Sequence, residues 1–243
     1  MKKIQLPLFT FNNSLRISLL FSLMLLSACG AESENNVSQA EQSGGATQIV
    51  EAVLLPLPGN EDSVPDLSEK VTVMMRTDIG DLTIEIFPAA APNAAARFQE
   101  LVEAGFYDNT PVFRVVPGFV AQFGINWRDD YPAWQDNKFD DDPSLFSLDR
   151  GTLAFAKAGP NTNSTQVFIN YAENNRLASP AFNFTAFGKV VTGMEFVDAF
   201  LQVGDPNGGL NQDQLWNNGA AYLDSLDSKP VMIVEAYIVA EGD

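Results

Sequence analysis

Residues 112–124, VFRVVPGFVAQFG, contain the feature that guides the interpretation of the whole chain. Two short apolar segments flank Pro117 and Gly118, a pair typical of turns, so the stretch predicts two neighbouring β-strands. Arg114 places a permanent cation among residues that otherwise look like core. Gln122 follows eight residues later across the turn, so the two side chains can approach each other on neighbouring strands. Taken alone, such an arginine is usually a surface residue whose aliphatic stem covers apolar neighbours.

The composition excludes several classes of protein and site. The chain has 243 residues and a formal net charge of −17, so it lacks the basic surface that nucleic-acid binding requires. It contains no histidine, which excludes Ser-His-Asp and Cys-His catalytic systems and histidine metal sites. Its single cysteine excludes an internal disulfide and cysteine-clustered metal sites. We therefore expect no metal and no cofactor, and any catalysis must use Arg, Lys, Asp, Glu, Tyr, Ser or Thr.

The amino-terminal residues have the layout of a secretory signal, in which basic residues precede an apolar run over residues 17–26. This run is too short to span a membrane. The sequence LSAC, which ends at Cys29, resembles the lipobox of bacterial lipoproteins, whose cysteine is acylated and becomes the first residue after cleavage. The resemblance implies a lipoprotein signal peptide over 1–28 and a lipid anchor on Cys29. Because Gly30 is not aspartate, it further implies the outer membrane, with the protein facing the periplasm. The alternative is an ordinary signal with an incidental cysteine.

Residues 29–70 are rich in Glu, Ser, Gln, Asn, Gly and Pro, and they predict a flexible acidic tether. Within it, residues 49–58, IVEAVLLPLP, are too apolar for a pure linker. We expect this patch either to dock on the folded domain or to act as a short recognition segment. The folded domain itself is predicted over 71–243.

The predicted domain is rich in β-strands. Residues 71–87 alternate apolar and polar side chains on both sides of a turn with Gly80, and they predict a hairpin. A helix is predicted within 92–109, with Pro92 near its start and Gly105 past its end, and its apolar positions Ala94, Phe98, Leu101 and Val102 share one face. A second helix is predicted over 193–203. Further strands are predicted over 110–116, 118–124, 151–156, 167–170, 184–191 and 230–240, and long loops over 125–150 and 204–229.

The loop 125–150 carries six aspartates between Asp129 and Asp142. Such a cluster raises the question of a calcium site. The aspartates lack the regular spacing and the glycine of an EF-hand loop. We therefore interpret the segment as a solvated acidic loop.

Three blocks of the sequence resemble the cyclophilin family of peptidyl-prolyl isomerases: FRVVPGFVAQFG, GTLAFAKAGPNTNSTQVFIN and FTAFGKVVTGMEFVDAF. Their order and spacing match, and the resemblance covers roughly residues 71–240, most closely to the bacterial periplasmic branch. It implies a mainly β fold, a closed eight-stranded antiparallel β-barrel capped by two α-helices. It also implies peptidyl-prolyl cis–trans isomerase activity. The residues by themselves indicate only a β-rich domain with two helices.

The resemblance implies roles for individual residues. Arg114 corresponds to the catalytic arginine, and Phe119 and Phe168 correspond to the pocket that holds the proline ring. Gln122 matches a glutamine that hydrogen-bonds both the substrate and the arginine, and Ala156 matches a residue whose backbone pairs with the peptide. The predicted catalytic residues are therefore Arg114, Gln122 and Phe119, and the predicted substrate-binding residues are Phe168, Ala156, Leu177, Val120, Lys157 and Phe184.

Several positions depart from the family pattern. Lys157 replaces an asparagine and is expected to favour acidic residues beside the proline. Arg176 occupies a position that is tryptophan or phenylalanine in many members, and it is expected to place a second cation near the rim of the pocket. The other departures are Phe113 and Phe184 in place of histidines, Val120 in place of methionine, Phe123-Gly124 in place of Gly-Gly, and Ser164 in place of glycine.

Three functional hypotheses follow. The first is an active isomerase that acts on proline-containing segments of exported or envelope proteins, and the intact set of pocket residues favours it. The second is a chaperone or assembly module that binds such segments with weak or no turnover. The third, an acyl-anchored surface adhesin, has only the lipobox and the tether in its support. We expect a monomer that reaches the membrane through Cys29 and binds no nucleic acid.

Overall fold

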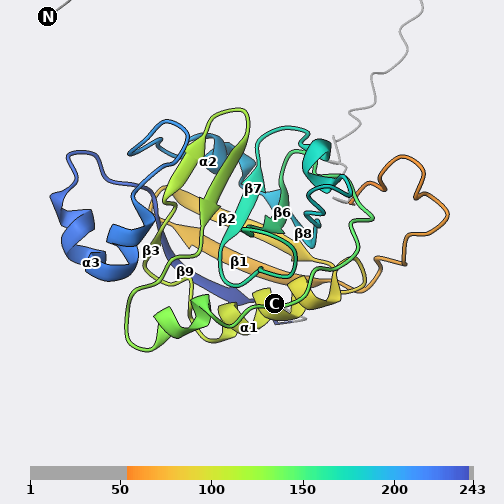
Figure 1. The fold of residues 1–243 in the computed structure, drawn as a ribbon, viewed down its shortest axis with the longest axis horizontal. Helices are drawn as coiled ribbons and strands as arrows, with labels where there is room; N and C mark the ends of the chain where they lie inside the picture. The colour runs from red at the N-terminus through yellow and green to blue at the C-terminus, as the bar shows by residue number, and fades with distance from the viewer. Residues whose placement is uncertain (1–53, 241–243) are drawn as a thin grey trace, which may run out of the picture. The chain divides into compact units, whose positions relative to one another are not determined.

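The computed structural model describes residues 54–240, and this part of the chain is built around one antiparallel sheet (Figure 1). Helices α1, α2 and α3 span Pro92–Glu103, Met194–Asp198 and Gln212–Ser225, and two 3-10 helices, η1 and η2, span Tyr131–Gln135 and Asn175–Ala178. The nine strands are β1 Val71–Thr77, β2 Gly80–Ile86, β3 Thr110–Pro111, β4 Arg114–Val116, β5 Val120–Phe123, β6 Thr152–Phe155, β7 Val167–Asn170, β8 Gly188–Thr192 and β9 Met232–Ile238.

The sheet is curled but open. Its strand order is β3-β9-β1-β2-β8-β6-β7-β5-β4, so the two edge strands are consecutive in the chain and only Val112 and Phe113 separate them. The prediction of a closed eight-stranded barrel is therefore wrong in strand number and in closure. Pro111 has no N–H to donate, and β3 is only two residues long. Between the two edge strands, the backbone bonds to a loop and not to another strand, since the Leu210 N–H donates to the Phe113 carbonyl at 2.8 Å.

The hairpin β1–β2 confirms the prediction for residues 71–87. Thr77 pairs with Gly80, which leaves a two-residue turn, and the Thr77 hydroxyl donates to the Gly80 carbonyl at 2.5 Å. A Cβ at position 80 would lie 2.4 Å from the Phe196 ring, so the glycine allows α2 to pack closely on the turn. The turn glycine is therefore required by packing as well as by backbone conformation.

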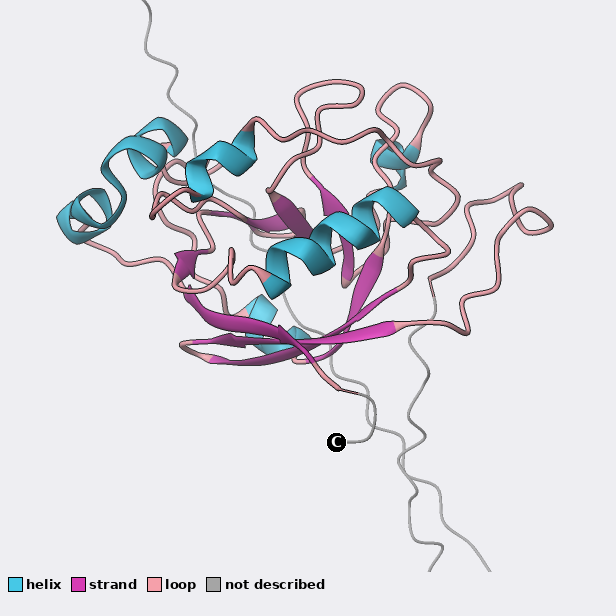
Figure 2. Ribbon diagram, turned by 90° about the horizontal axis from the view of Figure 1, so that it is seen from below, coloured by secondary structure: helices cyan, strands magenta, loops and turns pink. Residues whose placement is uncertain are grey.

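Helix α1 lies across one side of the curled sheet (Figure 2). Its predicted apolar face is confirmed, because Ala94, Phe98, Leu101 and Val102 are all buried. No side chain of its own caps its first turn. The carboxylate of Asp142 does so from the distant loop, and it accepts hydrogen bonds from the backbone N–H groups of Asn93 and Ala94 at 3.1 and 2.9 Å.

This cap corrects the prediction that loop 125–150 is solvated throughout. Asp129, Asp130, Asp136 and Asp140 are exposed, but Asp142 is buried and Asp141 is partly buried. Burial raises the pKa of Asp142, and the helix hydrogen bonds offset part of that rise. The last two aspartates of the loop are thus structural.

The predicted loop 204–229 contains a third helix. Asn217, Asn218 and Gly219 lower helix propensity, which explains why the sequence pattern predicts a loop there. Helix α3 breaks at Gly219, whose φ is +44°, and the ring of Trp127 packs where a Cβ would stand. Helix α2 is shorter than the predicted 193–203.

The described part of the apolar patch 49–58 docks on the domain. Leu54 is 1% exposed and belongs to one buried cluster with Phe146 and Leu148. The Ser147 N–H donates to the Leu55 carbonyl at 2.7 Å, and the Leu57 N–H donates to the Leu145 carbonyl at 2.9 Å. The folded unit thus includes residues that precede 71. The predicted signal peptide 1–28, Cys29 and most of the predicted tether lie outside the described residues. Within 54–240, no helix is long and apolar enough to cross a membrane.

Candidate functional site

Strands β4 and β5 place Arg114 and Gln122 side by side. The two residues are direct partners in the antiparallel register, and Arg114 Nη1 donates to Gln122 Oε1 at 3.1 Å. Gly118 at the turn has a φ of +74°, a conformation that glycine adopts without strain. The structure therefore confirms the contact between Arg114 and Gln122 that the spacing predicts.

The guanidinium of Arg114 is held by neutral acceptors. Its Nε donates to the backbone carbonyl of Asn207 at 2.6 Å, and its Cζ lies 5.8 Å from the centre of the Phe119 ring. Burial lowers the pKa of Arg114 from its usual value, but an arginine remains protonated at neutral pH after such a shift. The site thus contains a fixed positive charge that no carboxylate neutralises among the described residues.

A relay of three glutamines continues from Arg114. Gln122 is 8% exposed and its Nε2 donates to Gln166 Oε1 at 2.8 Å. Gln166 Nε2 then donates to Gln212 Oε1, on α3, at 2.9 Å. Because arginine only donates, it holds the oxygen of Gln122 towards itself, and this fixes the orientation of each following amide.

Gln166, Gln212 and Asn207 are not among the site residues predicted from the sequence. Gln166 lies two residues before Phe168, and a period of two places both on one face of a strand, so this signal could have found it. Gln212 and Asn207 come from a segment predicted as loop. No local pattern places that segment beside Arg114.

All nine predicted catalytic and substrate-binding residues line one pocket of about 220 Å³. Val120 and Phe168 are buried in its wall, and the rings of Phe168 and Phe184 meet edge-on with centroids 5.7 Å apart. The Ala156 N–H already donates to the Gln166 carbonyl at 2.8 Å, so only the carbonyl of Ala156 remains for a peptide. The lining residues are Arg114, Phe119, Val120, Gln122, Ala156, Lys157, Phe168, Leu177 and Phe184.

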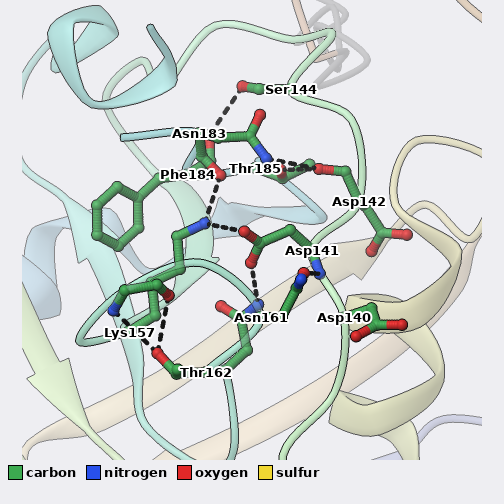
Figure 3. A network of polar contacts seen from close by, with 12 residues as sticks. Asp140, Asp141, Asp142, Ser144, Lys157, Asn161, Thr162, Asn183, Phe184 and Thr185 are labelled. Carbon is green, nitrogen blue, oxygen red and sulfur yellow. Dashed lines mark hydrogen bonds and ion pairs between the residues drawn. The ribbon is translucent and has the colours of Figure 1, made fainter. Parts of the chain in front are cut away.

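Lys157 takes part in a network that turns its charge away from solvent (Figure 3). Its Nζ lies 2.7 Å from Asp141 Oδ2 and donates to the Asn183 carbonyl at 2.9 Å, and its side chain is 4% exposed. Burial raises the pKa of Asp141, but hydrogen bonds from Lys157, the Asn161 backbone and Asn163, together with the charge of Lys157, outweigh burial and lower the pKa on balance. Because the side chain is buried, Lys157 offers no exposed ammonium to acidic residues beside the proline, and the expected attraction for them is not supported.

Among the other departures from the family pattern, Val120 and Phe184 line the pocket, whereas Arg176, Phe113 and Phe123 are not among its lining residues. Arg176 is exposed, and its Cζ lies 5.5 Å from the centre of the Phe182 ring. Phe113 and Phe123 are fully buried in two separate apolar clusters. Among residues 54–240, no three His, Cys, Asp or Glu side chains gather as a metal site would require.

Comparisons with known proteins show the family to which this chain is similar. Residues 72–217 match the family model described as cyclophilin type peptidyl-prolyl cis-trans isomerase/CLD. A peptidyl-prolyl cis-trans isomerase-like 3 of Rhizopus delemar is 35% identical over 136 residues, which cover 51% of this chain and 78% of the relative. A peptidyl-prolyl cis-trans isomerase of Acinetobacter baylyi is 34% identical over 147 residues, which cover 58% of this chain and 77% of the relative.

A solved structure supports the same conclusion. The crystal structure of a cyclophilin-type isomerase of Cryptosporidium parvum superposes with a TM-score of 0.55 at 25% identity, covering 71% of this chain and 99% of that one. A crystal structure of the same protein in the presence of the dipeptide ala-pro gives a TM-score of 0.53. The curled sheet, the pocket and the match over most of the described residues together show that this chain belongs to the cyclophilin-type peptidyl-prolyl cis–trans isomerase family.

Proposed function

We propose that this chain accelerates rotation about X-Pro peptide bonds, with Arg114 stabilising the twisted prolyl amide. The observation that carries this proposal is the fixed guanidinium at the edge of an apolar pocket, held by Gln122 and by the Asn207 carbonyl. Cyclophilin-type relatives are named as isomerases, which supports the reaction class.

The reaction needs electrostatic stabilisation and no proton relay. The partial double bond of the amide gives a barrier of about 18–20 kcal/mol, and uncatalysed exchange takes tens of seconds or longer. Millisecond exchange requires a barrier lower by about 6 kcal/mol, because each 1.36 kcal/mol changes the rate tenfold. Twisting the bond localises the lone pair on the prolyl nitrogen, so a donor aimed at that nitrogen favours the twisted state over both planar forms.

Arg114 has a donor available for this task. Its Nε is used by Asn207 and its Nη1 by Gln122, and among the described residues nothing accepts a hydrogen bond from its Nη2. The two occupied nitrogens hold the planar guanidinium in one orientation. Nη2 can therefore donate to a substrate without reorganisation at the moment of rotation.

The apolar wall of the pocket suits the proline ring. Phe119, Val120, Phe168, Leu177 and Phe184 supply aromatic and aliphatic surface and no charge. Holding the ring still while the preceding carbonyl swings converts binding energy into a preference for the twisted state. The carbonyl of Ala156 remains as an acceptor for the peptide backbone.

The test is cis–trans exchange of an Ala-Pro-Phe-type peptide, measured by protease-free NMR exchange spectroscopy. Arg114→Ala should lower kcat/KM by about 100-fold or more, the usual loss for removal of one transition-state donor. Arg76→Ala is the matched control, because Arg76 is an exposed arginine on β1 that pairs with Glu235 at 2.7 Å. Binding of the peptide without acceleration by the wild-type chain would replace this proposal with a peptide-binding chaperone on the same scaffold.

We further propose that the substrates are proline-containing segments of exported or envelope proteins, and that the chain acts as a monomer anchored through Cys29 on the periplasmic side of the outer membrane. The signal layout of residues 1–28 supports this proposal. Metabolic labelling with a fatty acid should mark the wild-type chain and not Cys29→Ser, and fractionation should move the variant out of the membrane. Equal labelling of both chains would contradict the anchor.

A further inference from the structure

A second cavity adjoins the proline pocket. Its volume is about 250 Å³, and it is lined by residues 157–160 and by Ala181, Phe182 and Phe184. Lys157 and Phe184 line both cavities, so they form a shared wall. A peptide with its proline ring in the first pocket therefore has neighbouring side chains within reach of the second.

Polar and apolar groups both line the second cavity, and its one charged side chain is already paired. The Lys157 ammonium is paired with Asp141 at 2.7 Å, bonded to the Asn183 carbonyl and placed 5.3 Å from the centre of the Phe184 ring. Figure 3 shows the amine pointing towards Asp141 and the backbone at Asn183. What remains for a ligand is the backbone of residues 157–160 beside alanine, proline and phenylalanine side chains.

Phe182 is the exposed aromatic residue of this wall, beside the exposed Ala158, Pro160 and Ala181. Phe182 is 44% exposed, and Arg176 Cζ lies 5.5 Å from the centre of its ring. A ligand side chain that covers Phe182 would remove apolar surface from water on both partners. The cation–π contact with Arg176 restrains the ring without filling the cavity.

We propose that this cavity is a subsite for one large apolar side chain of the client, such as leucine or phenylalanine, carried by a residue close to the isomerised proline. The inference rests on the proposed function for the placement of the proline. It assigns the preference to apolar rather than acidic neighbours, because the charge of Lys157 is already neutralised by Asp141.

The experiment uses the full chain and peptides that contain one X-Pro bond. Ala, Leu, Gln or Glu is placed in turn at each position from three before to three after the proline. At one position, leucine should raise kcat/KM about tenfold over alanine, the scale of a well-filled apolar pocket. Glutamate and glutamine should not differ from each other there. Amide shifts on titration with the leucine peptide should include residues 158–159 and 181–184.

Two variants test whether the cavity causes the preference. Phe182→Ala removes part of the wall, and Gly159→Leu fills the cavity. A Cβ at Gly159 meets no heavy atom within 4 Å. Both should bring the leucine-to-alanine ratio towards one. Tyr237→Ala should leave the ratio unchanged, because Tyr237 is an aromatic residue of matched exposure, 45%, on β9.

The outcomes separate this inference from the proposed function. Turnover that is equal for all neighbours, or a leucine preference that survives in both variants, would overturn the subsite and leave the isomerase intact. A preference for glutamate over glutamine would also overturn it. If the wild-type chain shows no turnover, the proposed function fails, and the amide shifts and binding constants of the same peptides still decide the subsite.

Discussion

Two cations lie on the wall of the same pocket, and their partners differ. Arg114 is held by an amide oxygen and a backbone carbonyl, and it keeps its full charge and one donor nitrogen. Lys157 is held by the carboxylate of Asp141, and its side chain is almost completely buried. Neutral acceptors orient a cation without neutralising it, whereas a carboxylate converts it into a structural ion pair. The partner thus decides whether a cation is available to a substrate.

The largest expected effect comes from breaking the buried pair. Lys157→Met keeps the stem and removes the ammonium, which leaves Asp141 without its main cationic partner. The free energy of unfolding should fall by about 3 kcal/mol, the low end of the range for removing one partner of a buried ion pair. Urea unfolding measures this. Arg150→Met is the matched control, because the Arg150–Asp198 pair at 2.7 Å is exposed and should contribute less than about 1 kcal/mol. Equal losses of unfolding free energy in the two variants would contradict the expected difference between the buried and the exposed ion pair.

A comparable effect on activity is expected when Arg114 becomes lysine. Lysine keeps the charge but lacks the planar fork that contacts Gln122, Asn207 and a substrate at once. We expect kcat to fall about 100-fold, which is about 2.7 kcal/mol, while KM changes little. A variant that retains wild-type kcat would show that a positive charge alone is sufficient and that the fixed orientation of the guanidinium is not required.

A smaller effect tests the glutamine relay. Gln212→Ala removes the acceptor for Gln166 and should loosen the orientation of Gln122, so kcat should fall about threefold to fivefold, or about 1 kcal/mol for one hydrogen bond. Gln212→Glu can still accept from Gln166 and should restore most of kcat. A merely structural role of Gln212 would lower stability without this rescue of kcat. Thermal unfolding of both variants provides the control.

The smallest effect concerns pH. The pKa of Asp141 is lowered in the folded state, so its contribution to stability is present above its unfolded value of about 3.9 and is lost as pH falls through the folded pKa. The stability difference between wild type and Asp141→Asn should therefore shrink below about pH 4. The contribution of Asp142 to stability changes with pH in the opposite direction, because burial raises its pKa. As pH falls over the acid range, the free energy of unfolding of the wild type should rise relative to that of Asp142→Asn. If the stability differences for both variants changed in the same direction with pH, this assignment would be contradicted.

Residues close in the sequence determined much of the fold and the site. The alternation in residues 71–87 predicts the hairpin, and the spacing of Phe98, Leu101 and Val102 predicts the buried face of α1. The eight-residue separation of Arg114 and Gln122 predicts their contact. These features depend on local periodicity and turn chemistry, which a sequence displays directly. The family resemblance adds the remaining seven residues of the pocket.

Only the tertiary structure decided which partner each charge has. Asp142 caps a helix 48 residues away in sequence, Asp141 neutralises Lys157 across 16 residues, and Asn207 holds Arg114 across 93. The open edge between β3 and β4 and the helix hidden in a glycine- and asparagine-rich segment were likewise decided by packing. Such contacts form because burial forces each polar group to find a partner, and the partner is whichever group the folded chain places within hydrogen-bonding distance.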